Sequence, residues 1–256
     1  MLSDQKGPHE MKEVIAIISR KGGTGKTTSA DSLAAALQKK GYKTLLIDLD
    51  AQRNLTAATG AKFTGPNITD VLTGSVTAEE ATQQTQNGDI ITGSPFLAAA
   101  DLVITSDKEL KEAIQLVLKN YDYVLIDTPA NYGKLTRNAL TVATSAIITQ
   151  EAATFSADGL KEAAAIIDQI KPINPALKLR GILITKYAGR SNIVKQILEE
   201  MRTTAEQLNT VVLDPPIRAT DKIIDAQAVH KNIVSYAPRN AAAQCYLAIA
   251  DIIEQW

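Results

Sequence analysis

The stretch ISRKGGTGKTTSADSLAAALQKKG, residues 18–41, decides the fold of this protein. It connects the apolar run EVIAIIS, residues 13–19, to a segment with apolar residues at helical spacing, so we expect a glycine-rich loop between a strand and a helix. In that position, successive backbone N–H groups and the N-terminus of the helix can bind phosphate groups. A tight glycine turn with incidental lysines is the alternative interpretation, and the strand–loop–helix context favours a phosphate loop.

Within this loop, Lys26 is predicted to neutralise the β- and γ-phosphates of a nucleotide, and the hydroxyl of Thr27 is predicted to ligate Mg²⁺. The glycines let the backbone wrap closely without Cβ clashes. The residues expected to contact the nucleotide are Gly22, Gly23, Thr24, Gly25, Lys26, Thr27 and Thr28. The loop also carries a second lysine, Lys21, although one lysine is enough to hold a nucleotide phosphate.

Short apolar runs alternate with helical patterns along the rest of the chain. The expected strands include residues 43–50, 89–93, 121–129, 145–150, 179–187 and 210–216, and the expected helices include 27–40, 107–119, 156–170, one from residue 192, and 240–256. This alternation predicts an α/β fold, a doubly wound and mostly parallel sheet with helices on both faces. Residues 13–256 are expected to form a single phosphate-loop domain after a short N-terminal extension, residues 1–12, and the polar stretch 73–88 is expected to be a surface connection.

Acidic residues stand where two predicted strands end. LLIDLDAQ, residues 45–52, places Asp48 and Asp50 on the same side of an extended chain, and ligands bind at the carboxyl ends of parallel strands. YDYVLIDTPA, residues 121–130, ends its apolar run in Asp127, the position expected to hold Mg²⁺ through water. Capping of the following turn is the alternative role for one of the first two carboxylates.

Composition excludes several classes of protein. The apolar runs are far shorter than the roughly 20 residues that span a bilayer, and no charged-then-apolar leader opens the chain, so we expect a cytoplasmic protein. A single cysteine, Cys245, provides neither a disulfide framework nor a paired-cysteine metal site within one chain. The net charge of −1 gives no standing attraction to DNA, so any binding of nucleic acid must be local or switched.

The form KGGTGKTT resembles the signature of the deviant phosphate-loop ATPases, the ParA/MinD group. The resemblance implies that Lys21 reaches across a dimer interface to the phosphates bound by the partner chain, which links ATP occupancy to dimerisation. It also implies that Asp50 positions the attacking water, that Asp48 supports Mg²⁺ or its water shell, and that Asp127 secures the metal. The catalytic residues expected on this basis are Lys21, Lys26 and Asp50.

The resemblance extends over nearly the whole chain and is closer to the ParA/Soj partition branch than to the division-site branch. In that branch, the loop after TVVLDPP closes over the adenine, which implies adenine contacts from Pro215 and Pro216, with Thr185 and Lys186 at the neighbouring strand end. Ordinary turn residues are the alternative. The branch also binds DNA without sequence preference, and the matching basic residues are Arg218, Lys222, Lys231, Arg190 and Lys195. A solvated surface is the alternative for each of these.

We therefore expect a Mg²⁺-dependent ATPase of plasmid or chromosome segregation, cytoplasmic and associated with the nucleoid. ATP would make a homodimer that binds non-specific DNA, and a centromere-binding or cargo-adaptor protein would stimulate hydrolysis and release. The C-terminal segment carries Asp251 and Glu254 and no cation, which argues against a membrane-surface helix. The alternatives are a related positioner of another cargo, such as an organelle, and a P-loop metabolic enzyme on the same fold.

Overall fold

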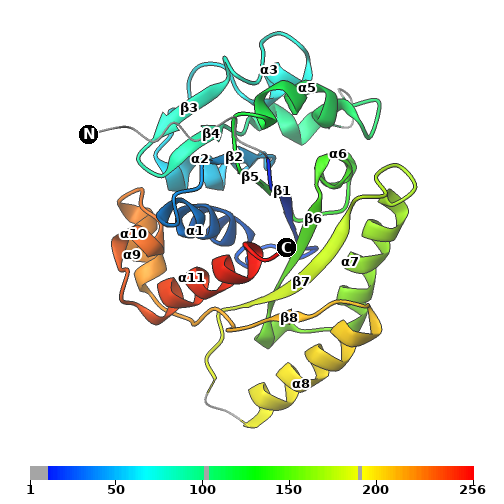
Figure 1. The fold of residues 1–256 in the computed structure, drawn as a ribbon, viewed down its shortest axis with the longest axis vertical. Coiled ribbons are helices and arrows are strands. Elements are labelled where there is room, and N and C mark those ends of the chain that lie inside the picture. The colour runs from blue at the N-terminus through cyan, green and yellow to red at the C-terminus, as the bar shows by residue number, and fades with distance from the viewer. Residues whose placement is uncertain (1–10, 101–103, 190–191) are drawn as a thin grey trace.

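The computed structural model describes residues 11–100, 104–189 and 192–256, and their strands form one eight-stranded sheet (Figure 1). The strands are β1 Glu13–Ile18, β2 Thr44–Asp48, β3 Thr82–Thr85, β4 Gly88–Ile91, β5 Tyr123–Asp127, β6 Ser145–Glu151, β7 Lys178–Thr185 and β8 Val212–Leu213. They lie in the order β3-β4-β2-β5-β1-β6-β7-β8. Every neighbouring pair is parallel except β3 with β4. The carboxyl ends of seven strands therefore meet at one edge of the sheet.

Helices cover both faces of this sheet. The α-helices are α1 Lys26–Lys39, α2 Asn54–Thr59, α3 Ile68–Leu72, α5 Glu109–Leu118, α6 Lys134–Val142, α7 Ala157–Ile170, α8 Asn192–Gln207, α9 Lys222–Ala228, α10 Ile233–Tyr236 and α11 Ala241–Ile253, and the 3₁₀ helices are η1 Pro95–Ala99 and η2 Ala152–Thr154. In Figure 1, α1, α9, α10 and α11 lie on one side of β1, and α6 and α7 lie on the other. None of the helices in the described ranges is both long and apolar enough to cross a membrane.

The central strand explains why both faces need cover. In β1, Val14, Ala16 and Ile18 point into a core that also contains buried residues of α3, α5, α6 and α7. Ile15 and Ile17 point into a second core with α1, α10 and α11. Alternate side chains of a strand point to opposite faces, so a continuously apolar strand requires burial on both sides. The prediction of a doubly wound, mostly parallel sheet is confirmed.

One part of the sequence-based assignment is wrong. The stretch 73–88, expected to be a surface connection, contains β3, which pairs antiparallel with β4 at the edge of the sheet. Its sequence TQQT has no buried residue and no apolar side chain, so neither continuous nor alternating hydrophobicity marks it as a strand. Its pairing with β4 and the hydrogen bonds between the Gln83 side chain and the backbone of Lys62, at 3.0 and 3.2 Å, hold this strand, and neither is visible in the hydrophobic pattern.

Candidate nucleotide-binding site

The predicted phosphate loop lies between the end of β1 and the start of α1, at the carboxyl edge of the sheet. Gly25 caps the helix with φ of 83°, in the left-handed region that favours glycine. A Cβ at this position would lie 3.3 Å from Cγ2 of Thr185, tighter than most side chains tolerate. The glycine is therefore required both by the backbone conformation and by the close approach of β7.

The neighbouring strands hold the loop in place. The hydroxyl of Thr185, the last residue of β7, donates to the backbone carbonyl of Thr24 at 2.8 Å. The hydroxyls of Thr24 and Thr149 on β6 are hydrogen-bonded at 3.0 Å, and all three threonines are buried. Thr185, predicted to lie near the adenine, thus contacts the loop itself and supports its conformation.

Two acidic residues lie side by side behind the loop, because Asp48 on β2 and Asp127 on β5 are partners in the parallel pairing. Oδ2 of Asp127 accepts a hydrogen bond from the Thr27 hydroxyl at 2.6 Å, while its buried Oδ1 has no hydrogen-bond partner. Burial, followed by the nearby charge of Asp48, raises the pKa of Asp127. An orphaned carboxylate oxygen beside a hydroxyl at the N-terminus of α1 fits a hard divalent cation such as Mg²⁺.

A cation at this position would need further ligands. Among the described residues, no group of three or more His, Cys, Asp and Glu side chains could hold a metal ion. Mg²⁺ is usually bound by one or two protein groups together with water and substrate phosphates. The oxygen atoms of Thr27 and Asp127 therefore fit a cation that takes its remaining ligands from water and from a phosphorylated molecule.

Asp48 is hydrogen-bonded differently from Asp127. Its Oδ2 accepts from both the backbone N–H and the hydroxyl of Thr56, at 2.9 and 2.7 Å, and its Oδ1 accepts from the N–H of Asp50 at 3.1 Å. Burial raises the pKa of Asp48 despite these three donors. The geometry favours a role in which Asp48 fixes α2 and the backbone that carries Asp50, and direct or water-mediated support of Mg²⁺ remains a prediction.

Lys26 and Asp50 line a cleft of about 590 Å³ over the loop. Lys26 is only 7% exposed, and burial lowers its pKa, while the charges of Asp127 and Asp50 act in the opposite direction. The residues around the cleft come from the loop, α1, α2, the segments after β2, β5 and β7, and α9 with its following turn: Gly22, Gly23, Gly25, Lys26, Thr27, Thr28, Asp50, Gln52, Asn54, Ala57, Ala58, Ala130, Lys186, Gln227 and His230. Of the predicted phosphate-loop contacts, residues 22–28, all but the buried Thr24 line the cleft, and the predicted catalytic side chains line it with one exception.

That exception is Lys21. It is exposed and lines a separate hollow of about 370 Å³, and its Nζ donates to the carbonyl of Thr154 at 3.3 Å. Lys21 is absent from the described residues that surround the phosphate-loop cleft. Within one chain, the two lysines of the loop therefore occupy different environments.

The predicted adenine contacts are only partly gathered at the cleft. Lys186 lines it, whereas Pro215 and Pro216, which follow β8, are not among its described lining residues. Sequence reasoning missed Gln227 and His230, which α9 and its following turn place in the cleft wall. No spacing rule connects them to a loop about 200 residues earlier.

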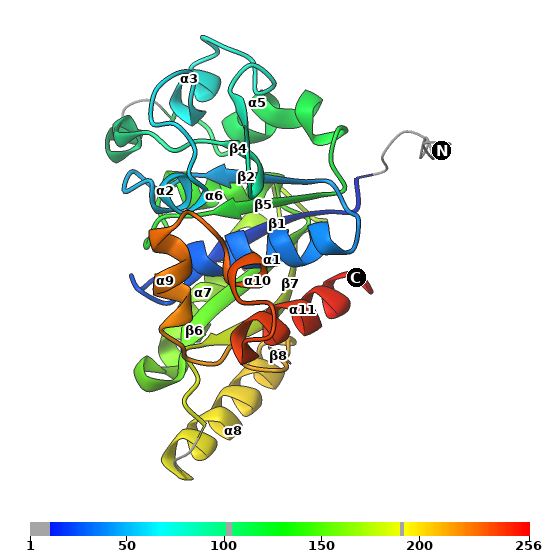
Figure 2. The same cartoon turned by 90° about the vertical axis from the view of Figure 1, so that its left-hand side faces the viewer.

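The predicted DNA-binding residues do not form one patch. Arg218 is exposed, with its guanidinium 5.2 Å from the ring centre of Tyr187. Lys222 begins α9 and pairs with Asp225 at 2.8 Å, and the exposed Lys231 follows the same helix. Lys195 is on α8, which lies apart from α9 in both views (Figures 1 and 2). Arg190 lies outside the described residues.

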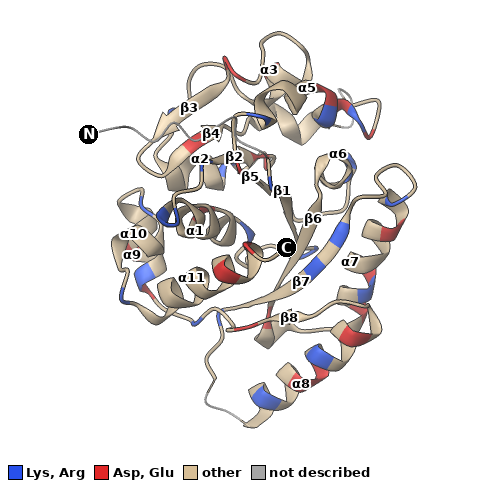
Figure 3. Ribbon diagram, viewed as in Figure 1, with Lys and Arg blue, Asp and Glu red and all other residues tan. Residues whose placement is uncertain are grey.

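Charge of both signs is spread over the ribbon. Figure 3 shows basic positions on β7, α8 and α9, with acidic positions on α7, α8 and α11. This mixture agrees with a net charge of −1.

Comparisons with known proteins agree with this geometry. A family model described as an AAA domain matches residues 12–179. The sporulation initiation inhibitor protein Soj of Bacillus subtilis is 31% identical over 94% of this chain and 97% of its own length. The chromosome partitioning protein ParA of Myxococcus xanthus is 31% identical over 96% of this chain and 89% of its own. A crystal structure of cobyrinic acid a,c-diamide synthase from Mycobacterium smegmatis, with bound ADP and magnesium, is 30% identical, covers 96% of this chain and 95% of its own, and superposes with a TM-score of 0.82.

Proposed function

The chain belongs to the ParA/MinD family of phosphate-loop ATPases, and we propose that it is a DNA-partition ATPase that binds ATP and Mg²⁺ in the cleft above α1. The observation that carries this proposal is the buried, orphaned Oδ1 of Asp127 beside Thr27 and Lys26. Isolated buried carboxylate oxygens are costly, and a cation with nucleotide phosphates would satisfy this one. The similarity to Soj and ParA over nearly the whole chain supports the partition role.

The residues of the cleft have separate tasks in this proposal. Lys26 and the loop N–H groups bind the phosphates, and Thr27 and Asp127 hold Mg²⁺, which neutralises charge on the phosphate oxygens when it is bound. Asp50, whose backbone N–H is fixed by Asp48, orients a water molecule toward the terminal phosphate. Because Lys26 is buried, its charge acts on the phosphates in a medium of low dielectric, where it has a larger effect than in water.

The position of Lys21 is an argument for the dimer that we propose. Its side chain is exposed and outside the cleft of its own chain, so it is available to a second copy. A cation that reaches the phosphates only from the partner makes hydrolysis conditional on dimerisation. Dimerisation also doubles the number of basic residues that face DNA, which raises affinity through multivalency. Arg218, Lys222 and Lys231 would contribute these contacts at the nucleoid, and an adaptor protein would end them by stimulating hydrolysis.

The test is binding to a random-sequence DNA fragment at moderate salt, with ADP, with ATP and Mg²⁺, and with the Asp50→Ala variant plus ATP. We expect tight binding only with ATP, and a longer lifetime on DNA for the variant because hydrolysis is blocked. Absence of DNA binding in every state, with ATP still hydrolysed, would contradict the partition role. If the protein binds DNA only with ATP but its cargo is an organelle and not a plasmid or chromosome, the identity of the cargo changes and the ATP-dependent switch remains.

A metabolic ATPase is the second candidate function. It is favoured by the similarity to cobyrinic acid a,c-diamide synthase, which covers 96% of this chain at 30% identity. In that case, ATP hydrolysis would depend on a small-molecule substrate and not on DNA or dimerisation. Measuring hydrolysis as a function of protein concentration distinguishes the two, because only a dimeric site gives a specific activity that rises with concentration.

A further inference from the structure

Helix α9 is in direct contact with the nucleotide cleft. Its Gln227 lines the cleft, and the side-chain Nε2 donates to the hydroxyl oxygen of Thr28 at 3.2 Å. Thr28 lies in the first turn of α1, next to the predicted metal ligand Thr27. Because the Thr28 oxygen accepts from Gln227, its own proton remains free to be donated to a phosphate oxygen.

The turn that follows α9 makes a second contact, with α2. Nδ1 of His230 lies 2.8 Å from the carbonyl oxygen of Ala57, so this nitrogen carries the proton. The carbonyl of His230 accepts from the side chains of Gln86 and Asn87, at 2.6 and 3.2 Å. His230 has φ of 53°, a conformation that non-glycine residues adopt rarely and that these contacts hold in place.

Helix α2 is in turn fixed to the acidic residues of the site. Thr56, the neighbour of Ala57, donates twice to Asp48, and Asp48 also accepts from the N–H of Asp50. A continuous series of hydrogen bonds and short chain segments therefore leads from Asp50 to His230. Two basic residues proposed to contact DNA, Lys222 and Lys231, are the first residue of α9 and the residue after His230.

We propose that α9 and its following turn, residues 222–231, transmit the state of the nucleotide cleft to the basic residues at their two ends, and that Gln227 is the positioning residue of this connection. The inference rests on the proposed function for its DNA-binding output. A phosphate that accepts a hydrogen bond from the Thr28 hydroxyl polarises this hydroxyl and strengthens the hydrogen bond that its oxygen accepts from Gln227. The bond through His230 connects the same element to the backbone around Asp50.

The test uses hydrogen–deuterium exchange of the α9 amides in the full-length protein, without nucleotide, with saturating ADP, and with a saturating non-hydrolysable ATP analogue and Mg²⁺. The variant is Gln227→Met, which keeps the size of the side chain and removes the donor. The matched control is Gln244→Met on α11, a glutamine whose Nε2 donates to the carbonyl of Pro238 at 2.7 Å. Occupancy is verified with a fluorescent nucleotide, and exchange in α5, which carries neither substitution, reports the integrity of the fold.

We expect nucleotide to slow exchange in α9 by several-fold in the wild type and in the control, and by less than twofold in Gln227→Met. The ratio of DNA affinities with ATP and with ADP should fall at least threefold in the same variant at full occupancy. Equal protection of α9 in the wild type and Gln227→Met would overturn the inference, as would no response of α9 to nucleotide in the wild type. If the wild-type protein binds no DNA but nucleotide still slows exchange in α9 in a way that depends on Gln227, the proposed partition function is contradicted and the connection between the cleft and α9 is supported.

Discussion

At the scale of single residues, substitutions of the two lysines of the phosphate loop should have different effects, one on nucleotide affinity and the other on ATP-dependent dimerisation. Lys26 is buried in the cleft and Lys21 is exposed outside it. We expect Lys26→Ala to weaken nucleotide binding about 10- to 100-fold, since it removes a charge-assisted contact worth roughly 1.5–3 kcal/mol. Lys21→Ala should change the affinity of the monomer by less than about threefold and abolish ATP-dependent dimerisation. Fluorescent-nucleotide titration and light scattering measure the two effects, and equal losses of affinity would contradict the separation.

Asp31 is a buried carboxyl for which the nucleotide chemistry gives no role. It is 3% exposed on α1, its Oδ1 has no hydrogen-bond partner, and burial raises its pKa to about 7. An unfolded Asp titrates near about 4, so between about pH 4 and 7 the folded state retains a proton that the unfolded state has lost. The contribution of Asp31 to the free energy of unfolding is therefore greatest below this window and falls as the pH rises through it.

The Asp31→Asn variant should remove this dependence. We expect the wild type to lose up to roughly 4 kcal/mol relative to the variant between pH 4 and pH 8, at about 1.4 kcal/mol per pKa unit. Urea unfolding of both proteins at several pH values measures the difference. All other titrating groups are shared, so their contributions largely cancel, and a difference independent of pH would show that Asp31 is ionised in the folded protein.

Site residues could be predicted from the sequence where neighbouring residues in the chain determine their position, and could not where tertiary packing does. Lys26, Thr27 and Asp127 each stand at a strand end or helix start, where sequence neighbours determine the geometry, and the structure brings them together. The hydrogen bonds of Asp48 to Thr56 could not be predicted in this way, because they depend on how α2 packs over the end of β2. Gln227 reaches the cleft only through the tertiary position of α9.

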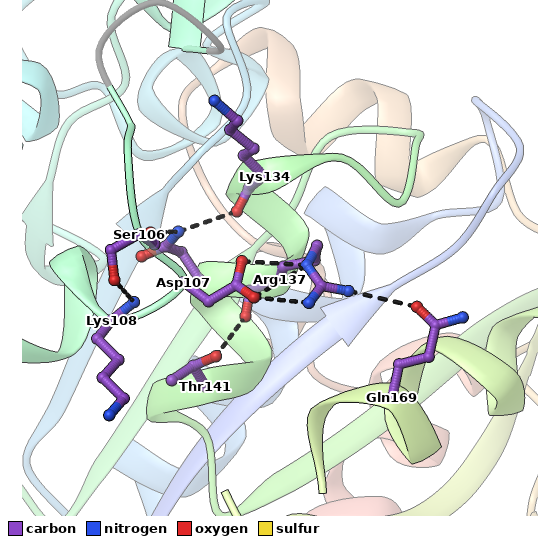
Figure 4. A network of polar contacts seen from close by, with 8 residues as sticks. Ser106, Asp107, Lys108, Lys134, Arg137, Thr141 and Gln169 are labelled. Carbon is purple, nitrogen blue, oxygen red and sulfur yellow. Dashed lines mark hydrogen bonds and ion pairs between the residues drawn. The ribbon is translucent and has the colours of Figure 1, made fainter. Parts of the chain in front are cut away.

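At the scale of elements, α6 is connected to its neighbours by a polar network (Figure 4). Arg137 makes a bidentate contact with Asp107, with Nε to Oδ1 at 3.0 Å and Nη2 to Oδ2 at 2.6 Å. Its Nη1 also donates to Gln169 on α7 at 3.3 Å. Since α6 begins seven residues after Asp127, this network positions the segment that follows the strand end predicted to hold Mg²⁺.

Arg137→Ala should therefore destabilise the protein by about 1–3 kcal/mol, because it leaves the half-buried carboxylate of Asp107 without its partner. Arg137→Lys should restore less than half, since an ammonium group cannot make the bidentate contact. Urea unfolding measures both. The matched control is Lys171→Ala, which removes an exposed pair with Asp168 and should cost no more than about 0.5 kcal/mol. Equal effects of Arg137→Ala and Lys171→Ala would argue against the network.

The elements differ in how strongly the sequence determines them. Strands β1, β2, β5 and β6 each contain a short apolar run, so they could be predicted from the local hydrophobic pattern. Strand β3 has polar side chains on both faces and is fixed by its hydrogen bonds to β4. The short helix α9 has one buried residue, so its existence depends on contacts with α2 and α10.

At the scale of the whole molecule, the order of the strands explains the position of the site. β1 lies between β5 and β6, and β2 lies beyond β5, so the phosphate loop and both acidic strand ends open onto one edge of the sheet. The sequence predicts each strand end separately. Their convergence follows because these strands are parallel, so all their carboxyl ends lie at the same edge of the sheet, where ligands bind.

Because the net charge is only −1, the proposed DNA binding should depend on the dimer, and its salt dependence tests this. Each phosphate contact contributes about 0.9 to the slope of log affinity against log salt concentration. If ATP-bound dimers bind DNA through Arg218 of both copies, Arg218→Ala should reduce the slope by about 1.8, twice the value for one contact. The matched control is Lys111→Ala, an exposed lysine on α5, where the slope should not change. Fluorescence anisotropy with labelled DNA at several salt concentrations gives both slopes. A reduction of about 0.9 would mean that a single copy makes the contact, and an unchanged slope would exclude Arg218 from the DNA interface.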